Sequence, residues 1–221
     1  GGTPLEFNTP APCDGYGNGL DGMRYVLPQR DLIADSIETM ALAHHLDALV
    51  FISSCDKIVP AQLLAAARLD FPSIFVTGGP MLPFDLFLPK DAPRILSQLV
   101  CPSSGACSGM GTANTMQFLT EALGMSLTGS ATTHAVQSEK IVQAKQSGIL
   151  VMRTLEHGLT PRRLMTRKAI ENAIMVQMAS GGSTNAVLHV LALADELGIS
   201  LDISEFDAIS RRVPHICGGL P

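Results

Sequence analysis

Two short apolar runs on either side of a helical segment limit the possible folds of this chain more than any other feature. Residues 48–52 and 73–76 are almost entirely apolar, which is typical of strands buried on both faces. Pro60 opens a helix between them that continues to Leu69. A strand, a helix and a strand at this spacing predict a parallel pair with a right-handed crossover. We therefore expect an α/β protein, built as a three-layer α/β/α sandwich with a mostly parallel sheet.

The periodicity of apolar residues predicts the remaining elements. Steps of three and four residues from Asp31 onward indicate a helix, whereas the first thirty residues are rich in Gly and Pro and predict a structured loop. Later helices are expected at residues 112–123, 138–146, 161–178 and 184–197, with a short one after Ser204 and a further strand at residues 148–152.

The composition predicts a single α/β domain over residues 1–221. Apolar residues make up 46% of the chain and charged residues only 16%, so disorder is excluded and the interior should be extensive. So few charges would also suit a subunit whose apolar face is covered by a second copy, and we expect a homodimer. A well-filled core explains the same composition equally well.

Charge, hydropathy and cysteine content exclude several classes of protein. The net charge of -5 comes without any run of Lys or Arg, so a nucleic-acid partner is not expected. No stretch reaches the roughly 18 uncharged apolar residues that span a bilayer, and the start lacks the features of a signal peptide. Five cysteines, an odd number, fit reduced thiols or metal ligands better than disulfides. We therefore expect a cytoplasmic protein without a membrane partner.

The segment Cys55-Asp56-Lys57 follows the first predicted strand directly. Ligands of open α/β sheets bind at the carboxyl ends of strands. The three side chains are a soft metal ligand, a hard metal ligand and an amine that can become a carbamate. Alternatively, Cys55 is a small buried residue and Asp56 caps the following helix.

A second cysteine, Cys107, lies in a glycine-containing loop before the helix expected from Thr112. The helix dipole and free backbone N–H groups there favour a thiolate, which makes Cys107 a candidate ligand or nucleophile. Its neighbour Cys101 ends an apolar run before Pro102 and is interpreted as a packed thiol.

The third candidate segment is Cys13-Asp14-Gly15. Gly17, Gly19 and Gly22 match the spacing of a dinucleotide-binding loop, but prolines flank the segment on both sides, and we reject that interpretation. The glycines still permit a close approach of the backbone to a ligand beside the Asp14 carboxylate.

Two further patterns leave alternatives open. The run 105–109, Gly-Ala-Cys-Ser-Gly, fits a cysteine hydrolase in which Asp202 or Asp207 and then His215 would follow Cys107 in chain order, although Pro102 interrupts the strand that such a site requires. The run 181–185, Gly-Gly-Ser-Thr-Asn, could bind a carboxylate or phosphate at a helix start, or could be a plain cap.

Six motifs in order resemble one family, the dihydroxy-acid and sugar-acid dehydratases. They are Asp14-Gly15 with Gly22-Met23-Arg24-Tyr25, then the run 27–36, Cys55-Asp56-Lys57, Gly78-Gly79-Pro80-Met81, Cys107-Ser108-Gly109-Met110 with Thr112-Ala113-Asn114, and the run 181–185. The motifs extend over nearly the whole chain. The resemblance implies a hydro-lyase that dehydrates a 2,3-dihydroxy carboxylic acid to a 2-keto acid in branched-chain amino acid biosynthesis.

The resemblance also implies a role for each matched residue. Cys55 and Cys107 correspond to thiolate ligands of an iron-sulfur cluster, with 2Fe–2S favoured over 4Fe–4S. Asp14 and Asp56 correspond to magnesium ligands, and Lys57 to a catalytic lysine whose carbamate also binds Mg²⁺. Soft sulfur ligands suit iron and hard oxygen ligands suit magnesium, so the two metals can occupy adjacent sites.

The chain also departs from the family. The resemblance implies a second, β-rich domain, which supplies a glutamate to the magnesium site and a serine base at C2, and both would lie beyond Pro221. We therefore expect these 221 residues to be incomplete as an enzyme. A sugar-acid (aldonate) dehydratase and a non-catalytic truncated relative remain alternatives.

Overall fold

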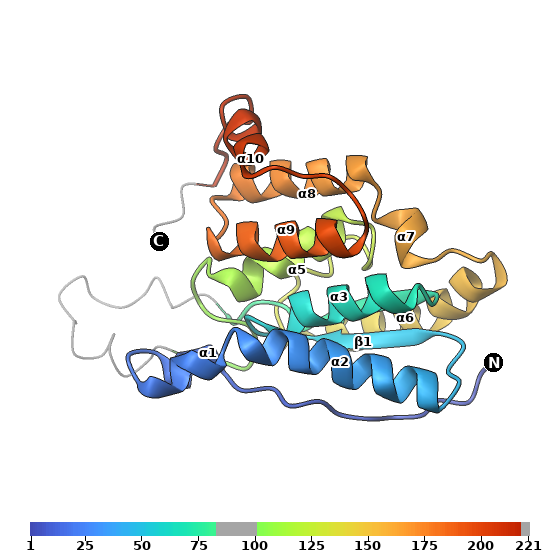
Figure 1. Cartoon of the computed structure of the whole chain (residues 1–221). Coiled ribbons are helices and arrows are strands. Elements are labelled where there is room, and N and C mark those ends of the chain that lie inside the picture. Colours follow the sequence, from blue (N-terminus) through green and yellow to red (C-terminus); the bar gives the residue numbers. More distant parts are fainter. Residues whose placement is uncertain (83–100, 218–221) are drawn as a thin grey trace.

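The computed structural model describes residues 1–82 and 101–217 and has two parallel strands at its centre. Strand β1 (Leu49–Ser53) pairs with β2 (Ser73–Thr77), with Leu49 opposite Ser73. Figure 1 shows helix α3 in front of the strands and α6 behind them, with α2 beside α3. The predicted α/β class and the parallel crossover are confirmed.

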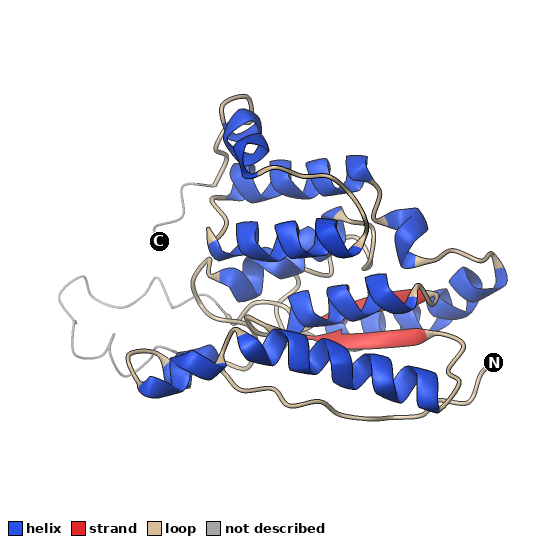
Figure 2. Ribbon diagram, viewed as in Figure 1, coloured by secondary structure: helices blue, strands red, loops and turns tan. Residues whose placement is uncertain are grey.

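The helices form most of the molecule, as Figure 2 shows. Their bounds are α1 Asp14–Gly17, the 3-10 helix η1 Asp21–Tyr25, α2 Pro28–Ala43, α3 Ile58–Leu69, α5 Thr112–Ala122, α6 Glu139–Glu156, α7 Pro161–Leu164, α8 Arg167–Ser180, α9 Asn185–Glu196 and α10 Ile203–Ser210. Within the described ranges the sheet has two strands, and Ser126 adds only an isolated parallel bridge to Phe75. The part of the sheet that the structure describes is therefore two strands wide.

Two sequence predictions are wrong. The strand expected at residues 148–152 belongs to helix α6. The single helix expected at residues 161–178 is broken into α7 and α8, because Thr166 leaves the helical conformation and its side chain accepts a hydrogen bond from the N–H of Ala169. A side-chain acceptor of this kind supplies a partner for one of the free N–H groups at a helix start.

Helix α3 is the centre of the core. Every residue from Val59 to Ala67 is buried, because the helix is covered by α2, α5, α9 and the strands. A helix that is apolar on all sides is stable only in such surroundings. The first residues of α3 are consequently held on a rigid element.

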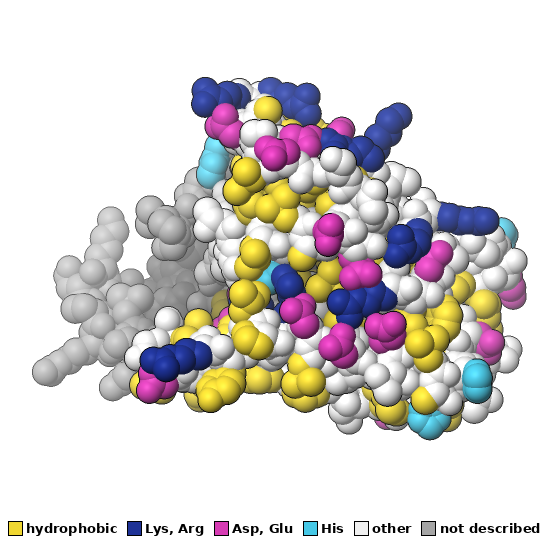
Figure 3. Space-filling model, in the orientation of Figure 1, with side chains coloured by type: hydrophobic (Ala, Val, Ile, Leu, Met, Phe, Trp, Pro, Cys, Tyr) yellow, Lys and Arg dark blue, Asp and Glu magenta, His cyan; other side chains and the backbone are white. Residues whose placement is uncertain are grey.

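No helix within residues 1–82 and 101–217 is long and apolar enough to cross a membrane. On the face shown in Figure 3, side chains of both charges are interspersed with hydrophobic ones.

Candidate metal centre

The turn from β1 into α3 brings three of the predicted site residues together. Cys55 has a φ of 77°, in the left-handed region that few residues other than glycine adopt. The turn also passes close to the segment after β2, where a Cβ on Gly78 would lie 2.8 Å from that of Ser54. Glycine is therefore required at that position. The turn directs Lys57, which precedes α3, into the molecule.

Lys57 lies between two carboxylates. Its Nζ is 2.9 Å from Oδ2 of Asp14 and also contacts Oδ2 of Asp56, while the residue is only 5% exposed. Asp14 is the first residue of the short helix α1, and its contact with Lys57 brings it to the turn that follows β1. The structure thus brings together Asp14, Asp56 and Lys57, the three residues predicted for the magnesium site.

The three charges change one another's pKa values. Burial opposes the charged form of Lys57, but hydrogen bonds with Asp56 and Asp14 outweigh it and raise the lysine pKa. Burial and then the hydrogen bond with Asp56 raise the pKa of Asp14 to about 6. Burial acts in the same direction on Asp56, but hydrogen bonds with Asp14, Lys57 and Thr112 lower its pKa. Two carboxylates in one buried site commonly separate in this way.

Two residues that belong to the family motifs, but to which the sequence analysis gave no individual role, surround Asp56. Asn185, at the start of α9, donates its side-chain amide to Oδ2 of Asp56 at 3.4 Å and to Oγ1 of Thr112 at 3.2 Å. Thr112, at the start of α5, also hydrogen-bonds Asp56 and lies 3.1 Å from Oγ of Ser183. The motif at residues 181–185 is therefore more than a plain cap. Its presence among the family motifs and its place at a helix start were the signals that could have indicated this.

Cys55 and Cys107 both lie at the carboxyl edge of the strands, near Cys13. Cys55 follows β1, and the residue before Cys107 is bridged to Pro80 beyond β2. Backbone N–H groups of Asp56 and Asp14 donate to the Cys55 sulfur, and Cys13 is close enough to act electrostatically on both thiols. Cys101 also lies within electrostatic range of Cys107 and is exposed, so it is not the packed thiol expected from the sequence.

The surroundings of both sulfurs disfavour the thiolate form. Burial raises the pKa of Cys55 to about 11. Partial desolvation of the sulfur, followed by the effect of Cys13, also raises the pKa of Cys107. A backbone N–H acts in the opposite direction on Cys107, as expected before the start of α5, but desolvation outweighs it. Metal ions bind the thiolate, so each cysteine must lose its proton on binding.

The partners expected for a cysteine hydrolase are engaged elsewhere. Asp202 caps α10, Asp207 pairs with Arg211, and His215 contacts the carbonyl of Cys217. Within residues 1–82 and 101–217 no hydrogen bond or ion pair joins any of them to Cys107, and the structure gives the hydrolase alternative no support.

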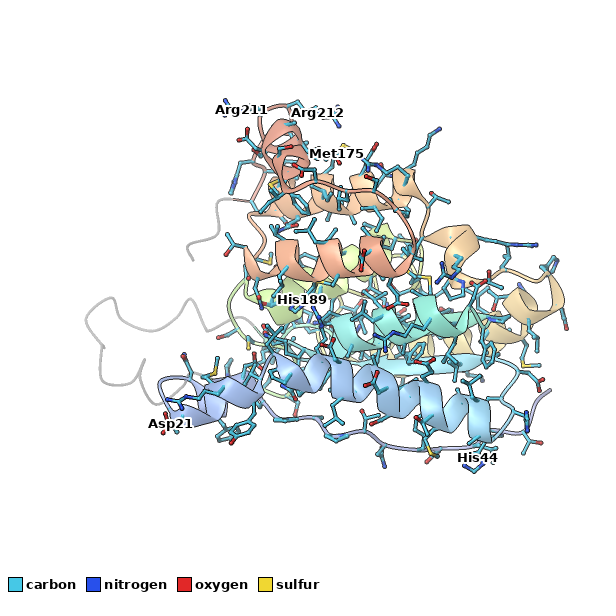
Figure 4. All side chains as sticks on the ribbon, in the orientation of Figure 1. Asp21, His44, Met175, His189, Arg211 and Arg212 are labelled. Carbon is cyan, nitrogen blue, oxygen red and sulfur yellow. The ribbon has the colours of Figure 1, made fainter. Side chains whose placement is uncertain are left out.

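A buried histidine, His189, lies within electrostatic range of Lys57. His189 projects from α9 toward the layer of α2 and α3 (Figure 4), and its Nδ1 is 3.4 Å from Nη1 of Arg30. Burial and then the charges of Lys57 and Arg30 lower the pKa of His189 to about 4. The imidazole is thus neutral at physiological pH, with Nδ1 accepting from the guanidinium.

The donor set fits a hard divalent cation bound through carboxylates. Oδ1 of Asp14 is buried and has no hydrogen-bond partner, while the ammonium of Lys57 lies where a cation between two carboxylates would lie. Across residues 1–82 and 101–217, no three His, Cys, Asp or Glu side chains converge as a metal site by themselves. A third oxygen ligand would therefore have to come from a modified Lys57 or from another group.

Comparison with known sequences identifies the family of the chain. Residues 1–221 match the family described as dihydroxy-acid/6-phosphogluconate dehydratase, N-terminal. The chain belongs to this dehydratase family. It is 50% identical to a dihydroxy-acid dehydratase of Ignicoccus hospitalis, across 100% of this chain and 44% of that protein. For the dihydroxy-acid dehydratase of Methanothrix thermoacetophila the identity is 49%, across 98% of this chain and 42% of the relative.

A third dehydratase of the family, the dihydroxy-acid dehydratase of Moorella thermoacetica, is 47% identical across 98% of this chain and 43% of its own length. The chain thus spans less than half the length of these three relatives. All of the residues gathered around Lys57 lie within the matched range.

Proposed function

We propose that this chain forms the metal-binding part of a hydro-lyase that converts a 2,3-dihydroxy carboxylic acid into a 2-keto acid. The observation that carries the proposal is the convergence of Asp14 and Asp56 on the buried amine of Lys57. Family membership supports the class of reaction, and the names of the relatives support a dihydroxy acid over an aldonate. The branched-chain amino acid pathway is the setting that we infer from these names.

In this proposal Asp14, Asp56 and a carbamate on Lys57 hold Mg²⁺, and Cys55 and Cys107 hold an iron-sulfur cluster, of the 2Fe–2S type. When bound, the metals supply Lewis acids for the leaving hydroxyl and for the oxygens beside the C2 proton. Backbone hydrogen bonds surround the Cys55 sulfur, and the carboxylates are buried beside Lys57. The soft sulfur ligands and the hard oxygen ligands would therefore form two separate, adjacent sites.

Carbamate formation changes the charge of Lys57 without changing its place. The ammonium and CO₂ yield the carbamate and release two protons, so a positive charge at the centre becomes a negative one. The raised pKa of Lys57 means that this exchange is unfavourable until a cation replaces the lost charge. Meanwhile Asn185 and Thr112 would hold the Asp56 carboxylate in a fixed orientation.

Metal binding tests this proposal directly. Mn²⁺, an EPR-active substitute for Mg²⁺, should bind the purified chain in bicarbonate buffer. Asp56→Asn should weaken this binding at least tenfold, which is about the effect of losing one charged ligand or the residue that supports it. Asp21→Asn is a matched control, since Asp21 lies in the same Gly-rich region but pairs with Arg24 at the surface. Equal affinity of the wild type and Asp56→Asn would contradict the magnesium site. Absence of both Mn²⁺ and iron-sulfur binding would favour a non-catalytic relative.

We also propose that two copies of the chain associate through helix α6. This helix buries polar side chains, among them Lys140, Gln143 and Ser147, whereas Ile141 and Ile149 on its outer face are 76% and 52% exposed. An apolar stripe on the outside of a helix is stabilised when it packs against an equivalent stripe, and a two-fold axis supplies one.

Sedimentation velocity tests the homodimer. Ile141→Lys should convert a dimer into a monomer, while Ile203→Lys, at an equally apolar and exposed site on α10, should leave it unchanged. A monomeric wild type, or a dimer that persists in Ile141→Lys, would exclude this interface.

We infer a cytoplasmic location for the protein. All five cysteines are free thiols, and a reducing compartment preserves such thiols for metal binding.

A further inference from the structure

The two halves of the loop that carries Cys107, before and after this residue, are held by different contacts. Before the cysteine, Ala106 pairs with the segment after β2, since its N–H donates to O of Gly79 and its carbonyl accepts from N of Met81, both at 2.9 Å. Residues 107–109, which follow, are exposed. The direction of the Cys107 side chain therefore depends on what holds this second half of the loop.

Asn114, in the first turn of α5, makes that contact. Its Nδ2 donates to the carbonyl of Cys107 at 2.6 Å and to that of Gly109 at 2.8 Å, and the residue is only 6% exposed. Both hydrogens of the amide are thus engaged. The opposite orientation would place Oδ1 against two carbonyl oxygens, so the contacts admit one orientation of the side chain.

Asn114 is itself held by a buried glutamine. Nε2 of Gln117 lies 3.5 Å from Oδ1 of Asn114, and Oε1 of Gln117 accepts from the N–H of Gly79 at 2.6 Å. Gly79 also pairs with Ala106, so hydrogen bonds run from the start of the loop through α5 to its end. The loop is fixed by this closed set of contacts rather than by burial.

We propose that Asn114 is a positioning residue that holds the Cys107 sulfur in place for cluster binding, an inference that rests on the proposed ligand role of Cys107. Metal–thiolate distances tolerate little displacement, and supports behind a ligand typically change metal affinity about 10- to 100-fold. Because the Asn114 amide donates to the carbonyls of the loop and not to a proposed ligand atom, its effect passes through the position of Cys107.

The test uses Asn114→Asp, which keeps the shape of the side chain but replaces the amide donor with an acceptor. Thr120→Val is the control, since Thr120 is buried on the same helix and its hydroxyl donates to O of Met116 within that helix. In the metal-free chain, amide exchange at residues 107–111 should be about tenfold faster in Asn114→Asp, as expected from the loss of one or two hydrogen bonds. After anaerobic reconstitution with iron and sulfide, the variant should hold at least tenfold less cluster, measured by bound iron, labile sulfide and visible absorption.

Each outcome separates this inference from the function on which it rests. If the wild type and Thr120→Val load a cluster and Asn114→Asp loads as much with the same spectrum, Asn114 has no positioning role, while the proposed function stands. If no cluster forms in the wild type, the ligand role of Cys107 and this inference both fall. Should Asn114→Asp not fold, Asn114→Ala removes the same donors without adding charge, and the same measurements on it decide.

Discussion

The ammonium of Lys57 lies 2.9 Å from a carboxylate oxygen of Asp14, although 43 residues separate them along the chain. Lys57 also contacts Asp56 and thereby offsets the repulsion between the two carboxylates. The same contacts stabilise the charge of a lysine that is buried at the end of a strand.

Removing this cation should destabilise the metal-free protein. In Lys57→Met, Asp14 and Asp56 would face each other without a counter-charge, and the loss of one partner from a buried ion pair typically costs about 3–5 kcal/mol of unfolding free energy. Urea unfolding measures the loss. Adding Asp14→Asn to Lys57→Met removes the repulsion and should restore part of the stability. If the double variant is no more stable than the single one, repulsion between the carboxylates is not the cause.

Cation uptake at this centre should be coupled to pH and to bicarbonate. Asp14, whose pKa is raised to about 6, must be deprotonated to bind a cation, so Mn²⁺ affinity should fall with pH below about 6, approaching about tenfold for each pH unit. Because a carbamate on Lys57 releases two protons, bicarbonate should strengthen binding above pH 6. EPR titration with and without bicarbonate measures both effects. Lys57→Met should lose the bicarbonate dependence, and its persistence in that variant would exclude the carbamate.

Lys140 should make the free energy of unfolding increase at alkaline pH. Its ammonium is buried, where it donates to the carbonyls of Thr77 and Ser130, and burial lowers its pKa from 10.5 to about 8. Between about pH 8 and 10.5 the folded protein has lost this proton while the unfolded chain retains it. Stability contributed by Lys140 therefore rises with pH through this window.

Urea unfolding from pH 7.5 to 10 checks this linkage. In Lys140→Met the rise should disappear, while Lys145→Met, at an exposed position on the same helix, should retain it. An equal pH dependence in the wild type and Lys140→Met would show that another group titrates.

The sequence predicted the central strands and the strand-end site because both depend on local patterns. Runs of apolar residues marked β1 and β2, and the rule for parallel sheets placed Cys55 to Lys57 at a ligand site. The proximity of Asp14 came from the family resemblance alone. No local pattern links a loop near the amino terminus with the end of β1.

Other features depend on tertiary packing and could not be predicted from the sequence. The apolar run at residues 148–152 resembles a strand, but α6 places Ile149 outward and buries Ser147 and Val151 instead. So short an apolar run does not distinguish a helix from a strand. Asn185 contacts Asp56 across 129 residues, and only the convergence of α3, α5 and α9 brings them together.

The last prediction concerns catalysis by these 221 residues alone. Reconstituted anaerobically with iron, sulfide and Mg²⁺, the chain should dehydrate 2,3-dihydroxyisovalerate at least about 100-fold more slowly than a full-length relative. In the proposed function the residues around Lys57 are ligands and their supports, while the resemblance implies that the base at C2 lies in the part of the relatives that this chain does not match. A positioned base typically contributes about 10²–10⁴-fold in rate. A keto-acid assay, run beside a metal analysis of the same sample, separates poor catalysis from poor loading. A rate equal to that of a full-length relative would mean that a base lies within the chain, and Asp14, with its raised pKa, would then be the first residue to test.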